Sequence, residues 1–337
     1  MKKISVLDCT LRDGGHVNNF LFGSDEIKEI CCRLSDGLID IIEVGFLKGN
    51  SYSIGTTLFP DIQTVEDILK DLEVKSKIAL MVRPDWYDAS VISYSSSVDI
   101  LRFAFRKQDI DETIRQATKV KSLGYSVYLN PVNILQYSDD EFSEILKRIK
   151  VIEPDGINIV DTFGGLNLEH LRRKFDVLNQ NLNKSCAVGV HLHENLSLAL
   201  SLALEFISFD SAFDNLLVDS SLWGMGRSPG NLPTELLAGY LNTHGVSDYK
   251  INELNRALQW PMRAYKEKYS WGYDPGYVTS ALLKVHRSYP EYFIVERGEP
   301  YPICYSCIQK IYEEGVGATF DPVVADRILS EIKNERC

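Results

Sequence analysis

The chain has 337 residues, which is too many for one small domain but suits a barrel of about 250 residues with an appendage. With 45% hydrophobic and 25% charged residues, it has the composition of an ordinary globular protein that can bury a sizeable core. Its formal net charge of −11 repels nucleic acid and anionic membrane surfaces at long range. This charge argues against both as partners, and we expect a small-molecule substrate.

The expected compartment is the cytoplasm. The first residues, MKKISVLDCTLRDGG, contain no apolar run of signal-peptide length, and no later run approaches the roughly 18 apolar residues of a membrane span. The seven cysteines are irregularly spaced, as expected for buried small hydrophobic residues. Cys304 and Cys307 form a single C-x-x-C pair, which is a weak signal for zinc or redox chemistry without a second pair or a following histidine.

Short β-rich runs alternate with longer amphipathic runs along the first 245 residues, a pattern typical of parallel βαβ units. The predicted strands are residues 4–9, 39–44, 77–82, 99–104, 126–130, 156–160, 187–192 and 215–219. Helix starts are indicated at Ser24, at Thr64, at Ser138 with Glu141 in a capping box, at Asn167, and at Pro233 before a helix over 234–241.

Eight strand–helix units by about residue 243 favour a closed (β/α)8 TIM barrel, with an open doubly wound sheet as the alternative. The composition shifts after residue 245, where the chain becomes rich in Trp, Tyr and Pro. We therefore predict a barrel domain over residues 1–245. Residues 246–337 are predicted to form a C-terminal helical extension packed on or near the barrel mouth and contributing to the site.

Polar and ionisable residues gather at the ends of the predicted strands, where the active sites of such barrels are built. His191 and His193 are the sharpest pair, because residues i and i+2 of a strand point to the same side. Asp13, after the first strand, would complete a facial set of two histidines and one carboxylate. An isolated H-x-H is more often a pair of hydrogen-bonded core histidines, but its strand-end position and the Asp13 loop reverse that preference.

Mixed nitrogen and oxygen ligands with open positions suit a divalent metal ion rather than a closed structural zinc site. Mn²⁺ or Mg²⁺ is the expected ion, with Zn²⁺ or Co²⁺ as alternatives. Asn231, in the loop from Gly224 after the eighth strand, is a candidate further oxygen ligand; a helix-start role is equally compatible with its sequence. The glycines of that loop suggest a phosphate or carboxylate cradle, although glycine loops alone are weak evidence.

Arg12 and His16 flank this predicted metal site on the first loop. An Arg-Asp pair is usually a surface ion pair, but Gly14 and Gly15 follow here and allow close substrate approach. Arg12 can hold a carboxylate or polarise a carbonyl, and His16 is a candidate general acid or base, its alternative being a surface loop histidine. Glu43 ends an apolar strand and is expected to pair with Arg12 or to orient the metal ligands without binding the metal itself.

With these residues in place, the chain resembles the DRE-TIM metallolyases, the superfamily of 3-hydroxy-3-methylglutaryl-CoA lyase. The closest branch is that of 4-hydroxy-2-oxovalerate aldolase. The resemblance covers roughly residues 1–245 and rests on four motifs in the right order, namely DCTLRDGGH (8–16), IEVGF (42–46), HLHEN (191–195) and SSLWGMGRSPGN (220–231). A histidine at the position of His16 is a feature of this branch and implies the acid–base role.

The resemblance also implies a reaction. It is the reversible cleavage of a 4-hydroxy-2-oxo acid to pyruvate and an aldehyde, with a divalent metal and Arg12 stabilising the enolate and His16 taking the 4-hydroxyl proton. In this branch a helical domain after the barrel supplies a tyrosine to the site. The stretch from Trp271 to Tyr277 looks similar, so Tyr277 is our choice for that role and Tyr273 the reserve.

Three other functions stay open at this point. A Claisen-type acyl-CoA synthase or lyase of the same superfamily is the first, and a non-catalytic barrel protein is the most distant. A Schiff-base aldolase would need a buried strand-end lysine, for which Lys48 is the only near candidate. We also expect a homo-oligomer, and a dehydrogenase partner stays open.

Overall fold

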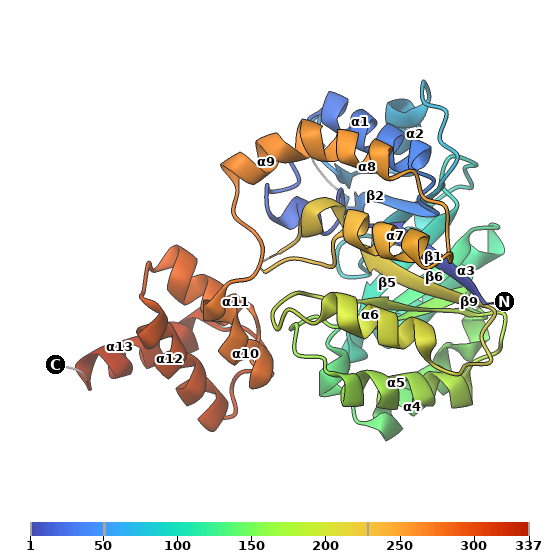
Figure 1. Ribbon diagram of the computed structural model, residues 1–337. Helices are drawn as coiled ribbons and strands as arrows, with labels where there is room; N and C mark the ends of the chain where they lie inside the picture. The colour runs from blue at the N-terminus through green and yellow to red at the C-terminus, as the bar shows by residue number, and fades with distance from the viewer. Residues whose placement is uncertain (1, 50–51, 228, 336–337) are drawn as a thin grey trace.

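The computed structural model describes residues 2–49, 52–227 and 229–335, and its centre is a closed parallel barrel (Figure 1). Its hydrogen-bonded strand order is β1-β9-β8-β7-β6-β5-β4-β2, and pairing of β1 with β2 closes the ring. The predicted (β/α)8 TIM barrel is therefore confirmed, and the open sheet is excluded. The eight strands are β1 (Lys3–Asp8), β2 (Ile41–Leu47), β4 (Lys77–Val82), β5 (Ile100–Phe105), β6 (Ser126–Pro131), β7 (Gly156–Val160), β8 (Ala187–His191) and β9 (Asn215–Ser220).

The strand bounds follow the prediction to within three residues, and the largest difference is in β2. This strand was predicted to end at residue 44 but runs to Leu47, past an irregular register between Glu43 and Phe46. Gly45 makes that passage possible, because a Cβ atom there would collide with the carbonyl oxygen of Thr57. The two-residue strand β3 (Leu58–Phe59) pairs with this end of β2.

Seven α-helices surround the barrel in the described part of residues 2–243, rather than the eight predicted. The connection from β4 to β5 carries only the short 3-10 helix η2 (Ala89–Val91), in a stretch rich in serine where no amphipathic run develops. The helices are α1 (Ser24–Asp36), α2 (Ile62–Leu69), α3 (Ile110–Ser122), α4 (Asp139–Ile149), α5 (Leu168–Asn181), α6 (Ala199–Ser208) and α7 (Thr234–Thr243).

The capping predictions had mixed outcomes. Ser138 and Glu141 form the predicted capping box, and Asn167 caps α5 through the backbone N–H of His170. Two starts were wrong. The N-cap of α1 is Gly23, whose φ of 90° suits glycine, so Ser24 is already helical. The carboxylate of Asp61 accepts from the Thr64 N–H and caps α2, which makes Thr64 an interior residue.

The predicted helical extension is present and contains two kinds of helix. Hydrophobic residues of α8 (Ile251–Ala257) and of the segment after it, including Leu254 and Trp271, belong to the barrel core. The helices α11 (Ser288–Glu291), α12 (Tyr301–Glu313) and α13 (Pro322–Asn334) share a second core, and α10 (Val278–Leu282) contacts α12; we call these four helices the C-terminal lobe. Between the two lies α9 (Arg263–Lys268). The expected domain division at 245/246 stays a prediction.

Cys304 and Cys307 lie on the buried side of α12, inside this second core. Burial raises the pKa of the Cys304 thiol to about 12. The C-x-x-C spacing therefore serves packing in the described structure.

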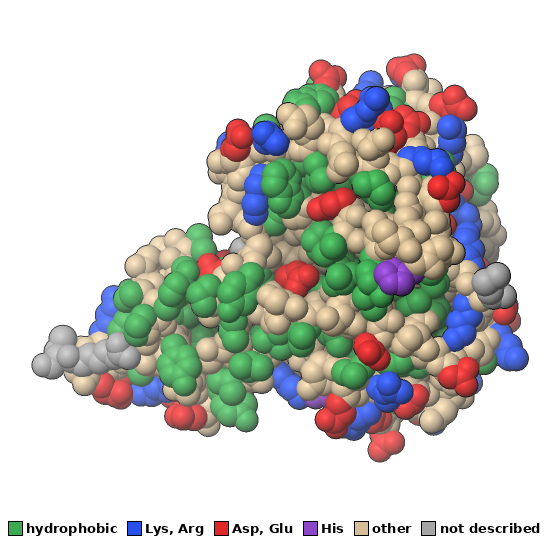
Figure 2. Space-filling view, viewed as in Figure 1, with side chains coloured by type: hydrophobic (Ala, Val, Ile, Leu, Met, Phe, Trp, Pro, Cys, Tyr) green, Lys and Arg blue, Asp and Glu red, His purple; other side chains and the backbone are tan. Residues whose placement is uncertain are grey.

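The C-terminal lobe faces the carboxyl ends of the barrel strands, as the expected position at the barrel mouth requires. His286 stacks edge-on against Phe163, in the loop after β7, with ring centroids 5.3 Å apart. Arg227, in the loop after β9, donates from Nε to Oε2 of Glu291 at 3.0 Å. Figure 2 shows the surface indented where the lobe meets the barrel. Among the described residues, no helix has both the length and the apolar character needed to cross a bilayer.

Candidate active site

The three predicted metal ligands come together at the carboxyl end of the barrel. Asp13 lies in the turn after β1, where its backbone N–H donates to the Cys9 carbonyl at 2.7 Å. His191 ends β8, and His193 follows two residues later. One potential ligand atom from each residue lies within 4.8 Å of those of the other two, and all three side chains are buried. A set of this kind can hold one divalent cation.

Asn231 lies at the same place. Its Nδ2 donates to Oδ2 of Asp13 at 2.9 Å, and its backbone forms an isolated β-bridge with His193. Its Oδ1 atom is buried and has no hydrogen-bond partner in the described part of the chain. The residue does not start a helix, because α7 begins at Thr234 after Pro233. An orphaned buried oxygen beside three potential ligands fits an additional metal ligand.

Arg12 connects the metal loop to the barrel interior. Its Nη1 donates to Oδ1 of Asp13 at 2.6 Å, and its Nε donates to Oε2 of Glu43 at 2.6 Å. All three side chains are buried. These two bonds use Nε and Nη1 of the guanidinium, so Nη2 is the nitrogen that can face a ligand. Glu43 is therefore the predicted partner of Arg12, held there as a buried anion.

The network continues across the barrel to the second metal ligand. Arg102 Nη1 lies 3.1 Å from Oε1 of Glu43, and its Nη2 donates to Oδ2 of Asp219 at 2.6 Å. The same Asp219 oxygen lies 3.2 Å from Nδ1 of His191, which leaves Nε2 of that ring for a metal. Three carboxylates and two guanidinium groups thus join Asp13 to His191 with a formal charge of −1, which suits a bound dication.

The protonation states also fit a metal site. Burial by itself would raise the pKa of Asp13, but the charges of Arg12, His191 and His193 hold it well below its ordinary value. Burial lowers the pKa of His193 well below its ordinary value, so this imidazole is neutral at pH 7. A carboxylate and a neutral imidazole are the forms that bind metal ions.

His16 ends the 3-10 helix η1 (Gly14–His16) next to these ligands, and its ring meets that of Phe20 edge-on at 4.9 Å. Burial, followed by the charges of Arg287, Arg227 and Arg12, lowers the pKa of His16 to about 3, against the opposing effect of Asp13. The imidazole is thus neutral at pH 7 and can accept a proton. It is not the exposed loop histidine that the sequence left as an alternative.

The family model for HMGL-like proteins matches residues 3–259, which include the candidate metal ligands, Arg12, His16 and Glu43. The chain belongs to the HMGL-like family. Two curated relatives are named 4-hydroxy-2-oxovalerate aldolase. The one from Thermomicrobium roseum is 27% identical over 83% of this chain and 81% of its own length, and the one from Pseudoalteromonas translucida is 25% identical over 88% of both. The resemblance read from the motifs is confirmed.

Solved structures agree with the HMGL-like fold. The N-terminal domain of a Bacteroides vulgatus protein provisionally named an aldolase has a TM-score of 0.75 and 27% identity, and the match covers 88% of this chain and 98% of that domain. The HMG-CoA lyase from Brucella melitensis matches with a TM-score of 0.65 at 12% identity over 79% of this chain and 100% of its own. At that identity the second match speaks for the fold alone.

Three further candidates from the sequence, two tyrosines for this HMGL-like site and the lysine of the Schiff-base alternative, have different surroundings. Tyr277 is buried at the end of the 3-10 helix η8 (Pro275–Tyr277), which leads into the C-terminal lobe, whereas the reserve Tyr273 is 59% exposed. The Schiff-base candidate Lys48 is exposed, and its Nζ lies 4.7 Å from the centre of the Trp86 ring. Its surroundings are not those of a desolvated nucleophilic lysine.

Sequence reasoning missed the arginines of the site other than Arg12. Arg102 had a readable signal, because a charged residue within the apolar run ILRFAF is expensive unless it is paired. Arg287 had no such signal in the sequence, because only the fold brings the C-terminal lobe to the metal loop. Its charge lowers the pKa values of both His16 and His193.

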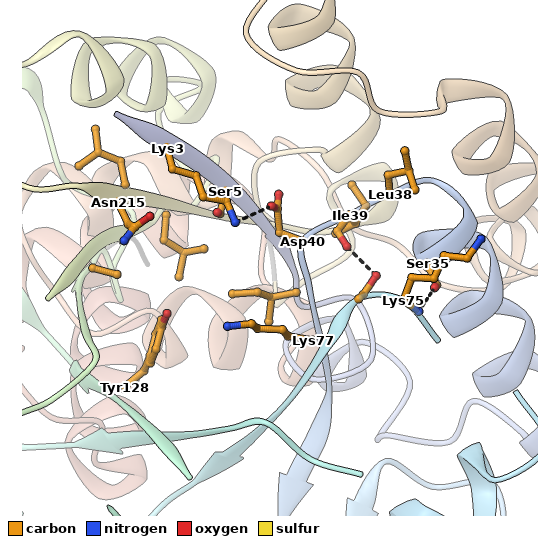
Figure 3. A pocket seen from close by; sticks show the side chains of 15 residues that line it. Lys3, Ser5, Ser35, Leu38, Ile39, Asp40, Lys75, Lys77, Tyr128 and Asn215 are labelled. Atoms are coloured by element: carbon orange, nitrogen blue, oxygen red, sulfur yellow. Dashed lines mark hydrogen bonds and ion pairs between the residues drawn. The ribbon is translucent and has the colours of Figure 1, made fainter. Parts of the chain in front are cut away.

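A second hollow, of about 400 Å³, lies at the opposite end of the HMGL-like barrel (Figure 3). It is lined by residues at the amino ends of the strands, among them Lys3, Lys77, Tyr128 and Asn215. Lys3 there pairs with Asp40 at 3.6 Å (Figure 3). No predicted site residue lines it, and conserved chemistry in this fold belongs to the other end.

Proposed function

We propose that this protein is a divalent-metal-dependent aldolase that cleaves or forms a 4-hydroxy-2-oxo acid, with pyruvate and an aldehyde as the other side of the reaction. The observation that carries the proposal is the buried set of Asp13, His191 and His193 beside Arg12 at the carboxyl end of the barrel. The aldolase names of the relatives support it.

The residues that would hold the metal are Asp13, His191 and His193, with Asn231 as a fourth. Two imidazole nitrogens and two oxygens leave positions for a 2-oxo acid, and this mixture fits Mn²⁺ or Mg²⁺, with Zn²⁺ or Co²⁺ as alternatives. When bound, the ion supplies Lewis acidity at the 2-oxo group of the substrate.

Arg12 binds the negative charge that develops on the 2-oxo oxygen as the carbon–carbon bond breaks. Glu43 fixes the orientation of its guanidinium through the 2.6 Å bond to Nε. In cleavage, the C3–C4 bond breaks, its electron pair goes to C3, and the 4-hydroxyl carbon becomes the aldehyde. His16, which is neutral, takes the 4-hydroxyl proton and returns it in the addition direction. Tyr277 is proposed to position or relay that proton.

The central test uses the full chain, stripped of metal and then supplied with Mn²⁺. We expect metal-dependent release of pyruvate from 4-hydroxy-2-oxo acids. His191→Ala and Asp13→Ala should lose both bound metal, measured by elemental analysis, and pyruvate release. His244→Ala, at an exposed histidine on α7's C-terminal side, is the matched control and should retain both.

Full metal occupancy in both ligand variants would sink the metal assignment. Cleavage of acyl-CoA substrates without pyruvate release would favour the Claisen-type alternative instead. The homo-oligomer, the cytoplasmic location and the dehydrogenase partner stay predictions.

A further inference from the structure

Arg287 brings an unpaired cation to the active site from the C-terminal lobe. It immediately precedes α11, and its Nη1 atom is buried with no hydrogen-bond partner in the described ranges. Burial, followed by the charge of Arg227, lowers the pKa of Arg287 to about 10, so the group is still a cation at pH 7. The carboxylate of Asp13 raises the pKa of Arg287, so the two groups interact electrostatically.

The neighbouring arginine is occupied, and this contrast makes Arg287 informative. Arg227 donates to Oε2 of Glu291 from Nε at 3.0 Å and to Oγ of Ser288 from Nη2 at 2.7 Å. Arg287 has no ion pair with any described residue. A guanidinium nitrogen that is buried without an anion is costly, and the planar fork of the group matches a carboxylate or a phosphate.

The space in front of Arg287 is a cavity of about 160 Å³ between the barrel loops and the lobe. Its lining is rich in cationic groups, with Arg83, Arg106, Arg227 and Arg287 all contributing. Two carboxylates also line it, and both are engaged, since Asp85 binds Arg83 at 3.0 Å and Asp109 accepts the Arg106 backbone N–H at 3.2 Å. The cavity therefore keeps an excess of positive charge.

A second orphaned polar atom faces the same region. Asn133 lines the cavity, and its Oδ1 is buried without a hydrogen-bond partner among the described residues. Asn133, Arg106 and His286 also line an adjoining cleft of about 550 Å³, which includes Lys107. The two spaces therefore share polar and cationic lining residues between the barrel loops and the lobe.

We propose that Arg287 binds an anionic group, a carboxylate or a phosphate, on the aldehyde half of the substrate, so that the enzyme prefers dianionic 4-hydroxy-2-oxo acids. This inference rests on the aldolase function proposed above. The 2-oxo acid half is assigned to the metal ligands and Arg12, so an anion at Arg287 is a second one. A hydroxyl between the reacting carbon and that anion would satisfy Oδ1 of Asn133.

A short neutral aldehyde would leave the buried Nη1 atom of Arg287 without a partner. An anion bound there would form charge-assisted hydrogen bonds with the guanidinium, which typically change affinity by roughly 10- to 100-fold. The expected discrimination is therefore of this size. It acts on the aldehyde half alone and leaves pyruvate enolisation to the metal centre.

The experiment measures aldol addition of pyruvate to two matched pairs of aldehydes by the Mn²⁺-loaded enzyme. The pairs are butanal with 4-oxobutanoate, and glyceraldehyde with glyceraldehyde 3-phosphate. We expect kcat/KM to be roughly 10- to 100-fold higher for the anionic member of at least one pair. The first pair reports a carboxylate and the second a phosphate. Arg287→Gln should abolish the preference, mainly through KM of the anionic aldehyde.

Arg297→Gln makes the same substitution at an arginine of the lobe that pairs on the surface with Asp326, and it should keep the preference. Pyruvate methyl-proton exchange needs no aldehyde and should fall far less in Arg287→Gln than addition to the anionic aldehyde. If that variant does not fold, the wild-type ratios alone decide. Equal kcat/KM within both pairs, or an undiminished preference in Arg287→Gln, would overturn this inference while leaving the aldolase intact. Absence of exchange and of addition with every aldehyde would instead overturn the proposed function.

Discussion

Arg12 and His16 lie four residues apart on one loop, yet their surroundings assign them different work. Arg12 is locked between Asp13 and Glu43 by two 2.6 Å hydrogen bonds, which suits a fixed electrostatic role. His16 lies against Phe20 and Phe46, without a charged group fixing its ring in the described contacts. It can therefore change its proton without breaking an ion pair.

This difference predicts that two reactions separate in two variants. Arg12→Ala should depress both pyruvate methyl-proton exchange and aldol cleavage, because both develop charge at the 2-oxo oxygen. His16→Ala should depress cleavage by about 10²-fold or more and exchange far less, as expected for loss of a general base. Deuterium exchange followed by NMR measures the first reaction and pyruvate release the second. Intact cleavage in His16→Ala would remove its assigned role.

The metal-dependent mechanism also predicts that the enzyme forms no Schiff base with pyruvate. Treatment with borohydride and pyruvate should leave the chain without a covalent adduct, because Lys48 is exposed and sits over the Trp86 ring. Mass spectrometry of the intact chain and its peptides provides the measurement. An adduct on Lys48 would transfer the chemistry from the metal centre to that lysine.

Asp8 is a buried carboxyl with a measurable effect on stability. Burial raises its pKa from 3.8 to about 6, although Thr234 and Thr10 donate hydrogen bonds to it. Folding thus favours the protonated form, whose stabilisation is complete below pH 3.8 and is lost as the pH rises through about 6. Two pKa units correspond to about 3 kcal/mol.

Asp8→Asn removes this titration. Relative to wild type, the variant should gain up to about 3 kcal/mol of unfolding free energy between pH 4 and pH 8. Urea unfolding at the two pH values gives the comparison. An equal difference from wild type at both would show that Asp8 does not titrate between them.

Local patterns were enough to predict part of the site. The H-x-H spacing and the RDGGH loop each place their residues by strand or turn geometry alone, and the structure brings Asp13, His191 and His193 together as expected. Arg287 could not be predicted, because its proximity depends on how a separate helical lobe docks. Glu43 was assigned to Arg12, but its second partner Arg102 comes from a strand two places along the barrel sheet.

At the scale of elements, a predicted helix start was wrong where a neighbouring side chain capped the helix instead. Asp61 caps α2 in place of the predicted Thr64 start, because its carboxylate reaches both the Thr64 N–H and the Thr64 hydroxyl at 2.8 Å. The missing helix between β4 and β5 is likewise a matter of local sequence. Alternation of apolar and polar runs predicted the strands well because each barrel strand is buried on both faces.

The loop after β9 is shaped around the metal ligands, and one glycine tests this shape. A Cβ atom at Gly226 would lie 2.5 Å from Nδ2 of Asn231 and 3.0 Å from Oδ2 of Asp13. Gly226→Ala should therefore weaken Mn²⁺ binding by about tenfold or more, since ligand positions within about 0.5 Å decide such sites. Isothermal titration with Mn²⁺ measures this effect.

Gly239→Ala is the control for this variant, because nothing lies within 4 Å of a Cβ atom at that position in α7. It should leave Mn²⁺ affinity unchanged and raise the unfolding free energy by about 0.5–1 kcal/mol. If the two alanine variants bind Mn²⁺ equally well, the loop has room that the structure does not show.

At the scale of the whole molecule, the C-terminal lobe lies beside the barrel, on the side of its carboxyl strand ends (Figure 1). Gly165, after β7, allows α10 to approach the barrel loops closely, since a Cβ atom there would collide with the carbonyl oxygen of Ala281. Gly165→Ala should therefore push the lobe outward. We expect reduced aldol cleavage and faster hydrogen exchange in α10, with the bound metal retained because the ligands belong to other loops. Unchanged exchange in α10 would contradict this docking.

The charged network inside the barrel has a consequence for how this protein can evolve. From Asp13 through Arg12, Glu43 and Arg102 to Asp219, each ion is the partner of the next, and Asp219 lies beside His191. Losing either arginine removes the cation that two buried carboxylates share, at a cost of about 3–5 kcal/mol. We therefore expect substitutions in this network to occur in compensating pairs. Arg287 is not part of the network, so a change in specificity for the aldehyde is easier to evolve than a change at the metal site.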